Sequence, residues 1–160
     1  MSKPSIRRIL VAVDFSRCSR VALEYAIFLA APFDASLAVL HVWDAPMYAG
    51  AEGIIVRDED GERKTLASLV QGHARQELRA FLADFHGVPR LTSELAAGHP
   101  HEVIVEHARA HDLVVVGTHG RRALARLFLG SVAERVLRAA HCPVVTVHDE
   151  GDAAVATAAR

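Results

Sequence analysis

The chain has 160 residues, 51% of them hydrophobic, and a formal net charge of -1 at pH 7. This length favours one domain with a buried core. The near-neutral charge argues against general attraction to nucleic acid or to an anionic membrane. The two cysteines, Cys18 and Cys142, are far apart, so no disulfide framework is expected. The apolar runs are too short for a signal peptide or a membrane span, and we expect a cytoplasmic protein.

Apolar runs and helical periodicity alternate along the chain. Four apolar runs and one alternating segment, residues 91–97, predict five strands, and segments with one apolar face at helical spacing predict a helix in each interval between them. This alternation is typical of a single-domain α/β fold in which helices cover both faces of a parallel sheet through right-handed crossovers. The predicted strands are 9–13, 36–43, 91–97, 112–117 and 143–147, and the helices lie near 17–29, 65–85, 100–108 and 131–140.

Two segments fall outside this alternation. Residues 44–63 lose the apolar pattern and contain an acidic cluster, which indicates a mobile flap or a solvated insertion. Residues 151–160 are small and polar and predict a flexible C-terminal tail after a nucleotide-binding domain that spans 1–150.

The segment after the fourth predicted strand carries most of the chemical information. It reads Gly117-Thr118-His119-Gly120, then nine residues, then Gly130-Ser131. A glycine where a strand ends allows a tight turn and close backbone approach to a ligand. Residues 131–134 match a capping box and predict a helix that begins with Ser131 as its cap. Helix N-termini favour phosphate oxygens, so the segment indicates phosphate binding.

Other interpretations of this segment were weighed. Taken singly, Gly117 could be only a turn, Ser131 only a helix cap, and the loop arginines only a solvated surface. The segment is not a Walker A loop, because GxxxxGK[ST] does not occur, and it is not the GxGxxG of dinucleotide-binding folds. Those two motifs follow a first strand, whereas this one follows the fourth.

The glycine spacing, together with the opening run ILVAVDFS, resembles the universal stress protein family, and the resemblance covers about residues 6–148. It implies a Rossmann-like five-stranded sheet in the order 3-2-1-4-5. In that order the first and fourth strands are neighbours whose connections leave in opposite directions, so a crevice opens at their carboxyl ends. Asp14 and Gly117 would then lie on its two lips.

Within the family, the glycine loop marks the members that bind ATP, so the resemblance implies an ATP-binding protein. Asp14 would lie near the ribose, and the backbone of Val42 would meet the adenine edge. A Mg or Mn ion would be bound through the phosphates. The implied nucleotide-binding residues are Ala12, Val13, Asp14, Val42, Val116, Gly117, His119, Gly120, Arg121, Gly130, Ser131 and Val132.

The leading functional hypothesis is a regulatory, stress-response protein that binds ATP with little or no turnover. The alternative is a slow ATP hydrolase or phosphotransferase that uses the same pocket, although the sequence offers no identifiable catalytic base. A third hypothesis is a structural dimer with an empty pocket. A zinc site was also weighed, at His99 with His101 or at His107 with His111, but no general base accompanies either pair as in HExxH.

The last predicted strand indicates a homodimer. In the order 3-2-1-4-5, residues 143–147 form an edge strand that is short, apolar and free of charged residues. Such an edge presents unpaired backbone groups, which a second copy related by a two-fold axis can cover. The resemblance adds to this expectation, since family members often dimerise in this way.

Overall fold

A computed structural model describes residues 5–43, 53–58, 60–118 and 129–149. Its main sheet has five strands in the order β5-β2-β1-β6-β7, and all four pairings are parallel. The strands are β1 (Arg8–Val13), β2 (Ser36–Trp43), β5 (Leu91–Ala97), β6 (Leu113–Gly117) and β7 (Val144–Val147). Counted among these five, the order is 3-2-1-4-5, so the predicted fold class is confirmed.

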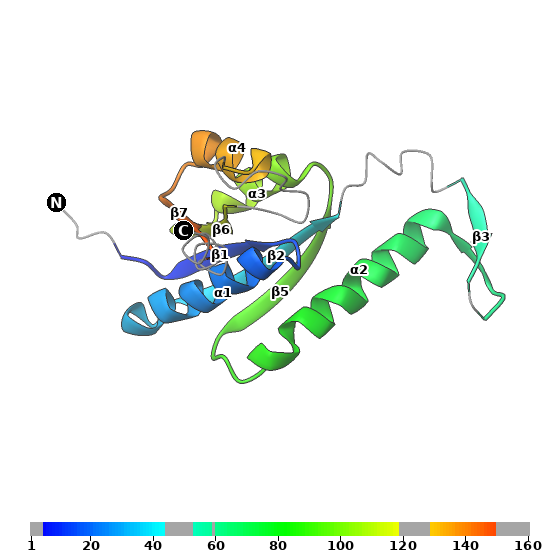
Figure 1. The fold of residues 1–160 in the computed structure, drawn as a ribbon, viewed down its shortest axis with the longest axis horizontal. Helices are drawn as coiled ribbons and strands as arrows, with labels where there is room; N and C mark the ends of the chain where they lie inside the picture. The colour runs from blue at the N-terminus through cyan, green and yellow to red at the C-terminus, as the bar shows by residue number, and fades with distance from the viewer. Residues whose placement is uncertain (1–4, 44–52, 59, 119–128, 150–160) are drawn as a thin grey trace, which may run out of the picture.

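Helices cover both faces of this sheet (Figure 1). On one face lie α1 (Arg17–Ala30) and α2 (Leu66–Leu82), which are followed by the 3-10 turns η1 (Ala31–Phe33) and η3 (Ala83–Phe85). On the other face lie α3 (Pro100–Ala108) and α4 (Ser131–Ala139). Successive strand side chains point to opposite faces, so two apolar clusters form, one centred on Val11 and Leu23 and the other on Leu10 and Val136.

The predicted insertion contains an antiparallel hairpin in its described part. Strands β3 (Ile55–Arg57) and β4 (Arg63–Thr65) pair with Ile55 opposite Thr65, and Gly61 turns the chain with a φ of 80°. The Asp58 carboxylate accepts the N–H groups of Asp60 and Glu62 at 3.1 and 2.8 Å. The predicted insertion therefore contains two short strands that the sequence analysis did not identify.

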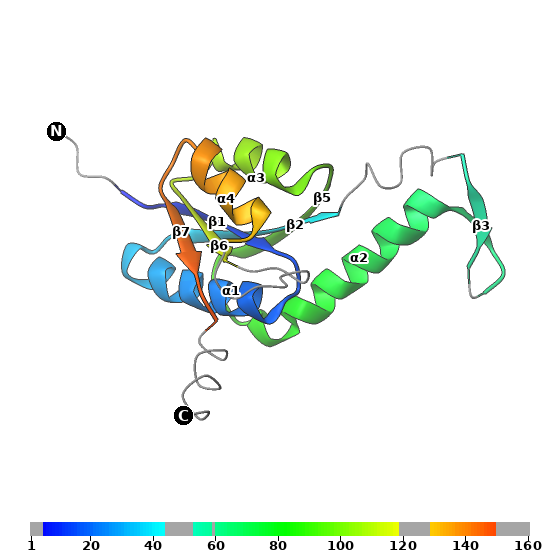
Figure 2. The same cartoon turned by 45° about the horizontal axis from the view of Figure 1, so that its top comes forward.

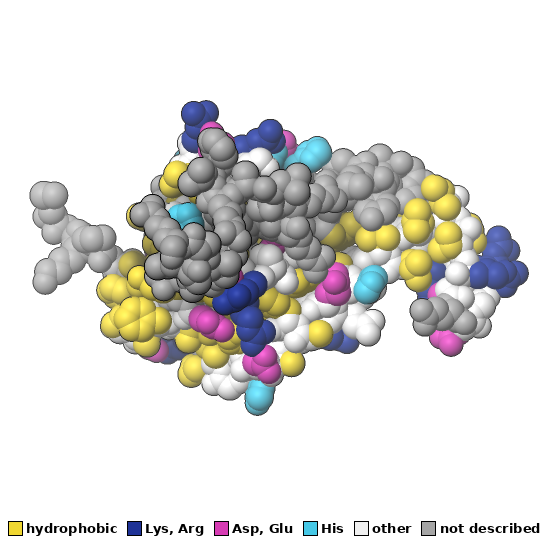
Figure 3. Space-filling view, viewed as in Figure 1, with side chains coloured by type: hydrophobic (Ala, Val, Ile, Leu, Met, Phe, Trp, Pro, Cys, Tyr) yellow, Lys and Arg dark blue, Asp and Glu magenta, His cyan; other side chains and the backbone are white. Residues whose placement is uncertain are grey.

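The hairpin stands away from the sheet, at the amino-terminal end of α2 (Figures 1 and 2). Only Ala74 and Leu78 of α2 are buried, and both lie in the C-terminal part of the helix, beside the sheet. Hydrophobic side chains gather over the outer half of α2 and the hairpin in Figure 3, where Ile54, Ile55 and Leu69 are exposed. This half of α2 therefore contributes little to the core.

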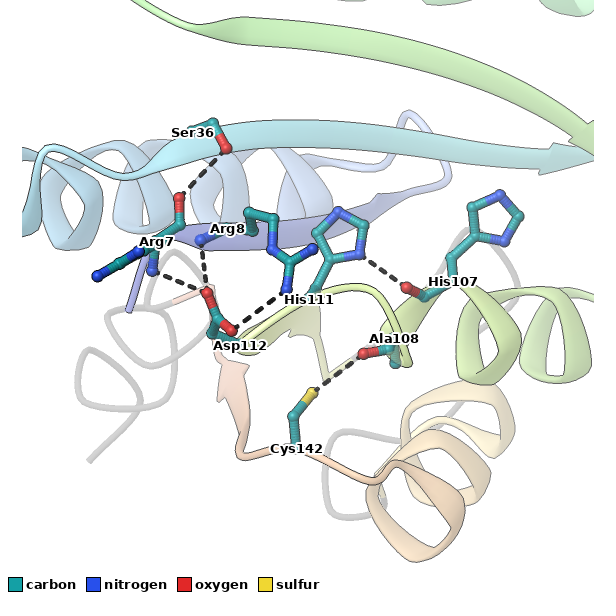
Figure 4. Close-up of polar contacts among 8 residues, drawn as sticks. All are labelled: Arg7, Arg8, Ser36, His107, Ala108, His111, Asp112 and Cys142. Atoms are coloured by element: carbon teal, nitrogen blue, oxygen red, sulfur yellow. Dashed lines mark hydrogen bonds and ion pairs between the residues drawn. The ribbon is translucent and has the colours of Figure 1, made fainter. Parts of the chain in front are cut away.

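The amino ends of β1 and β6 are joined at the edge of the sheet shown in Figure 4. Asp112, just before β6, accepts the N–H groups of Arg7 and Arg8 at 2.9 Å each, and its other carboxylate oxygen lies 3.7 Å from the Arg8 guanidinium. The backbone N–H of Arg7, with the backbone and side chain of Arg8, lowers the pKa of Asp112. This contact fixes two adjacent strands at the edge opposite the predicted site.

Candidate functional site at the carboxyl edge of β1 and β6

Asp14 lies in the tight turn between β1 and α1. One of its carboxylate oxygens accepts the Ser16 N–H at 3.1 Å. Ser16 is the N-cap of α1, and its hydroxyl accepts the Ser19 N–H at 3.1 Å. Asp14 is half-buried. The turn therefore fixes one carboxylate oxygen against the backbone where the first strand ends.

Gly117 ends β6 directly beneath the first turn of α1. A Cβ added there would lie 3.0 Å from the Cys18 sulfur and 3.1 Å from the Cys18 carbonyl carbon. Gly117 is not among the described residues with positive φ. The close approach of α1 therefore favours glycine at position 117. The sequence suggests that glycine is present here so that a ligand can approach the backbone. The structure instead gives packing against α1 as the reason.

Thr118 connects the end of β6 to the start of α4. Its side chain is buried, and its N–H donates to the Val147 carbonyl at 2.9 Å. Its own carbonyl accepts the Gly130 N–H at 2.7 Å. The two ends of the glycine-rich segment therefore meet through one hydrogen bond. His119, Gly120 and Arg121, which the sequence assigns to the phosphates, lie outside the described residues.

The two lips that the sequence predicts are adjacent. β1 and β6 pair in parallel with Ala12 opposite Val116. Asp14 and Thr118 each lie two residues further on, so both follow the same carboxyl edge, and Gly130 is tied to Thr118. Parallel sheets bind ligands at this kind of position, where neighbouring strands send their connections in opposite directions.

Three of the predicted nucleotide-binding residues lie on one face of the sheet. Ala12, Val42 and Val116 all belong to the apolar cluster covered by α3 and α4, where Ala133 packs with them. Val13 points to the opposite face and belongs to the cluster under α1. Because the side chains of Val42 and Val116 are buried, a molecule bound at the edge would meet chiefly their backbone groups.

The start of α4 differs from the prediction. Gly130 is the N-cap, with φ -59° and ψ 145°, and no side chain caps this helix. Ser131 is the first helical residue, so the predicted capping box is wrong: the Ser131 hydroxyl is one position too late to cap. The first helical hydrogen bond runs from the Glu134 N–H to the Gly130 carbonyl at 2.9 Å. The N–H groups of Ser131 and Val132 therefore lie in the first turn, where a helix has no internal acceptors.

The histidines do not form a metal site in the described part of the chain, where no group of three or more His, Cys, Asp or Glu residues could hold an ion. α3 ends at Ala108, so His111 lies beyond the helix, and the predicted pair with His107 on one helix is wrong. The His107 ring bonds to the Val103 carbonyl at 2.8 Å and to the Glu94 carboxylate at 3.0 Å. Both partners are acceptors, so this geometry favours a ring that carries a proton on both nitrogens, and the pKa of His107 is raised.

Two residues beside the site were not assigned to it from the sequence. Phe15, which follows Asp14, has a φ of 64°, and its ring stacks on His41 with 4.0 Å between centroids. The His41 ring also donates to the Val13 carbonyl at 2.8 Å. No sequence pattern predicts the left-handed backbone at Phe15, because bulky residues seldom adopt it.

The model of the universal stress protein family matches residues 5–148. The chain belongs to the universal stress protein family. The universal stress protein MJ0531 of Methanocaldococcus jannaschii is 34% identical over 145 residues, which cover 88% of this chain and 81% of that protein. The sequence resemblance is thereby confirmed.

Solved structures of the family share the fold. The universal stress protein UspA from Lactobacillus plantarum has a TM-score of 0.69 and 25% identity, covering 89% of this chain and 98% of that chain. A universal stress protein crystallised in complex with cAMP has a TM-score of 0.56 and 25% identity, covering 90% and 98%. Within the part of the chain that the structure describes, none of the helices combines the length and apolarity that a membrane span needs.

Proposed function

We propose that this universal stress protein binds ATP at the carboxyl edge of β1 and β6 and acts as a regulatory protein with little or no turnover. The observation that carries the proposal is the convergence of Asp14, Thr118 and Gly130, joined by the 2.7 Å bond between the last two. A family member complexed with cAMP supports an adenine nucleotide as the ligand.

In this proposal the end of β1 and the start of α4 contact different parts of ATP. Asp14 accepts hydrogen bonds from the ribose hydroxyls, and the Val42 backbone reads the adenine edge. The first turn of α4, with Gly130, Ser131 and Val132, holds phosphate oxygens, because its N–H groups and the helix dipole favour anions. His119, Gly120 and Arg121 complete the phosphate contacts, and a Mg or Mn ion is held through the phosphates.

Binding without turnover is the favoured activity for a chemical reason. Hydrolysis needs a group that orients the attacking water and a charge that neutralises the γ-phosphate. The proposal assigns the Asp14 carboxylate to the ribose, and the Ser16 N–H already fixes one of its oxygens. An assay with saturating Mg-ATP decides this point. Release of less than about one phosphate per protein per hour supports a regulator, and sustained release supports the slow hydrolase.

Calorimetry with ATP and GTP tests the ligand. We expect ATP to bind at least about tenfold more tightly than GTP, because a good recognition contact to the base is worth about 1.4 kcal/mol or more. Asp14→Ala should weaken ATP binding. Asp112→Ala is the matched control, because its carboxylate also accepts backbone N–H groups but at the opposite edge of the sheet. Equal affinity for ATP and GTP, or equal loss in both variants, contradicts the proposal.

We also propose a homodimer through the edge strand β7. The carbonyls of Pro143 and Val147 accept N–H groups from β6 and the residue after it. Since backbone groups alternate along a strand, the N–H and C=O groups of Val144 and Thr146 point away from β6. A second copy can pair with these groups in antiparallel fashion.

Thr146→Pro separates dimerisation from folding, because it removes one outward N–H and leaves the bonds to β6 in place. Lysine at Val145 and Val147 is a poorer test, since both side chains pack against the core under α1. Light scattering at micromolar concentration should find a dimer in the wild type and a folded monomer in Thr146→Pro. A wild-type monomer, or a variant that is still dimeric, contradicts this proposal.

A further inference from the structure

Phe15 holds an unfavourable backbone conformation immediately beside Asp14. Its φ of 64° lies in the left-handed region, where a bulky side chain is an outlier. Such conformations persist when surrounding contacts enforce them, and they concentrate at functional sites. Two rings contact Phe15 here: His41 from β2, stacked at 4.0 Å and 29°, and Phe81 from α2, at 5.6 Å. The strain at Phe15 is therefore maintained by side chains from two other elements.

His41 contacts the residues on both sides of Asp14. Its Nδ1 donates to the carbonyl oxygen of Val13 at 2.8 Å, and its face stacks on the ring of Phe15. β1 and β2 pair with Val13 opposite His41, which places the imidazole beside the last carbonyl of β1. The His41 side chain thus fixes Val13 and Phe15, the residues on either side of Asp14, whose carboxylate the proposed function assigns to the ribose.

We propose that His41 and Phe15 are positioning residues for the nucleotide: they hold the turn so that the Asp14 carboxylate faces the ribose hydroxyls. The proposal rests on the proposed function of ATP binding. The bond from the Ser16 N–H to Asp14 fixes one carboxylate oxygen within the same turn, and the left-handed Phe15 sets the direction in which the turn leaves β1. Neither His41 nor Phe15 needs to touch the nucleotide.

A merely structural role predicts something different. Phe15 and Phe81 pack against the core cluster under α1, so their loss lowers stability in either case. A structural role leaves the folded variant able to discriminate among ligands as the wild type does. A positioning role lowers the discrimination between nucleotides with and without ribose hydroxyls. That ratio, measured on folded protein, distinguishes the two roles.

The experiment compares ATP with 2′,3′-dideoxy-ATP by calorimetry. We expect the wild type to bind ATP about tenfold more tightly than the dideoxy nucleotide, since one or two hydrogen bonds to a charged carboxylate are lost. Asp14→Ala should reduce this ratio to near one, and His41→Ala should reduce it to below about three. His41→Phe, which keeps the ring but loses the donor to Val13, is the second variant in case His41→Ala does not fold.

His107→Ala is the matched control, because that ring also donates from Nδ1 to a backbone carbonyl at 2.8 Å but belongs to α3. It should keep the wild-type ratio. In the double variant of Asp14 and His41, the ratio and the ATP affinity should equal those of Asp14→Ala alone, because residues that act through one another are not additive.

Each outcome bears on one claim. If folded His41→Ala or His41→Phe keeps the tenfold ratio, the positioning role is overturned and ATP binding stands. If wild-type protein binds both nucleotides equally, Asp14 does not contact the ribose hydroxyls, and the positioning role falls while ATP binding stands. If the wild type binds neither, the proposed function itself has failed, and the positioning role falls with it.

Discussion

Gly117→Ala tests whether the end of β6 is shaped by helix packing. The added Cβ would lie 3.0, 3.1 and 3.3 Å from the sulfur, carbonyl carbon and carbonyl oxygen of Cys18, where ordinary contact begins near 3.4 Å. The sulfur can move, but the two backbone atoms belong to α1 and cannot move alone. Overpacking of this kind costs about 1–3 kcal/mol. The lower unfolded-state entropy of alanine offsets about 0.4–1 kcal/mol of that cost.

The expected net loss in the free energy of unfolding therefore lies between about 0 and about 2.6 kcal/mol, with a central value of about 1.3 kcal/mol. At that central value the melting temperature of a chain of this size falls by roughly 3–5 °C. Chemical denaturation of the purified variant measures the loss directly. Adding Cys18→Ala should recover part of it, since only the sulfur contact is removed and the two backbone contacts remain. The two substitutions should therefore cost less together than the sum of their separate effects.

The same variant separates packing from ligand contact. Because the added methyl group points at α1, the ATP affinity of the folded variant should change by less than about threefold. A Gly117→Ala protein as stable as the wild type would refute the packing argument. If the variant is as stable as the wild type but no longer binds ATP, then glycine at position 117 is needed for the approach of the ligand, as the sequence suggests.

Three further predictions concern charges and caps. Ser131→Ala should leave the melting temperature of the nucleotide-free protein within about 1 °C, since Gly130 and not Ser131 is the cap, and should weaken ATP binding; calorimetry and thermal melting measure both. Partial burial alone lowers the pKa of His107, but its bonds to Glu94 and Val103 outweigh this and raise it, so their stabilisation is present below about pH 6.5 and disappears as pH rises through the raised pKa. Glu94→Gln should therefore lower the melting temperature more at pH 5.5 than at pH 8.5. The corresponding loss in the free energy of unfolding should be less than about 1 kcal/mol, because the pair is partly exposed. Asp112 has a lowered pKa, so Asp112→Asn should destabilise by about 1 kcal/mol near pH 7 and by nothing once pH falls below that pKa, as denaturation at a series of pH values will show.

The main sheet was predictable because its signals are long and redundant. β2 occupies the residues that its apolar run predicts, and β5 occupies those that its alternating pattern predicts. Each buried run of β1 and β6 faces apolar helices on both sides. Asp14 and Gly117 follow from strand ends, so their shared edge was predictable too. A parallel sheet leaves few other places for them once its order is known.

The features that sequence reasoning missed depend on single contacts. Strands β3 and β4 have three residues each, too few for a periodicity, although Asp60-Gly61 is a recognised turn signal. The capping box at residues 131–134 failed because Gly130 caps the helix one residue earlier, and a glycine cap is only a few tenths of a kcal/mol weaker than a serine cap. The left-handed Phe15 depends on rings that come from β2 and α2, which no local pattern reveals.

The most direct test of nucleotide binding at this edge is a titration of isotope-labelled protein with Mg-ATP, followed by the backbone amide resonances in NMR spectra. The account predicts saturable shifts at residues 12–14, at 116–118 and at 130–132, where β1, β6 and α4 meet. The amides of Arg7 and Arg8 at the opposite edge, held by Asp112, should not move. No shifts with millimolar Mg-ATP, or shifts confined to residues away from the carboxyl ends of β1 and β6, would contradict it.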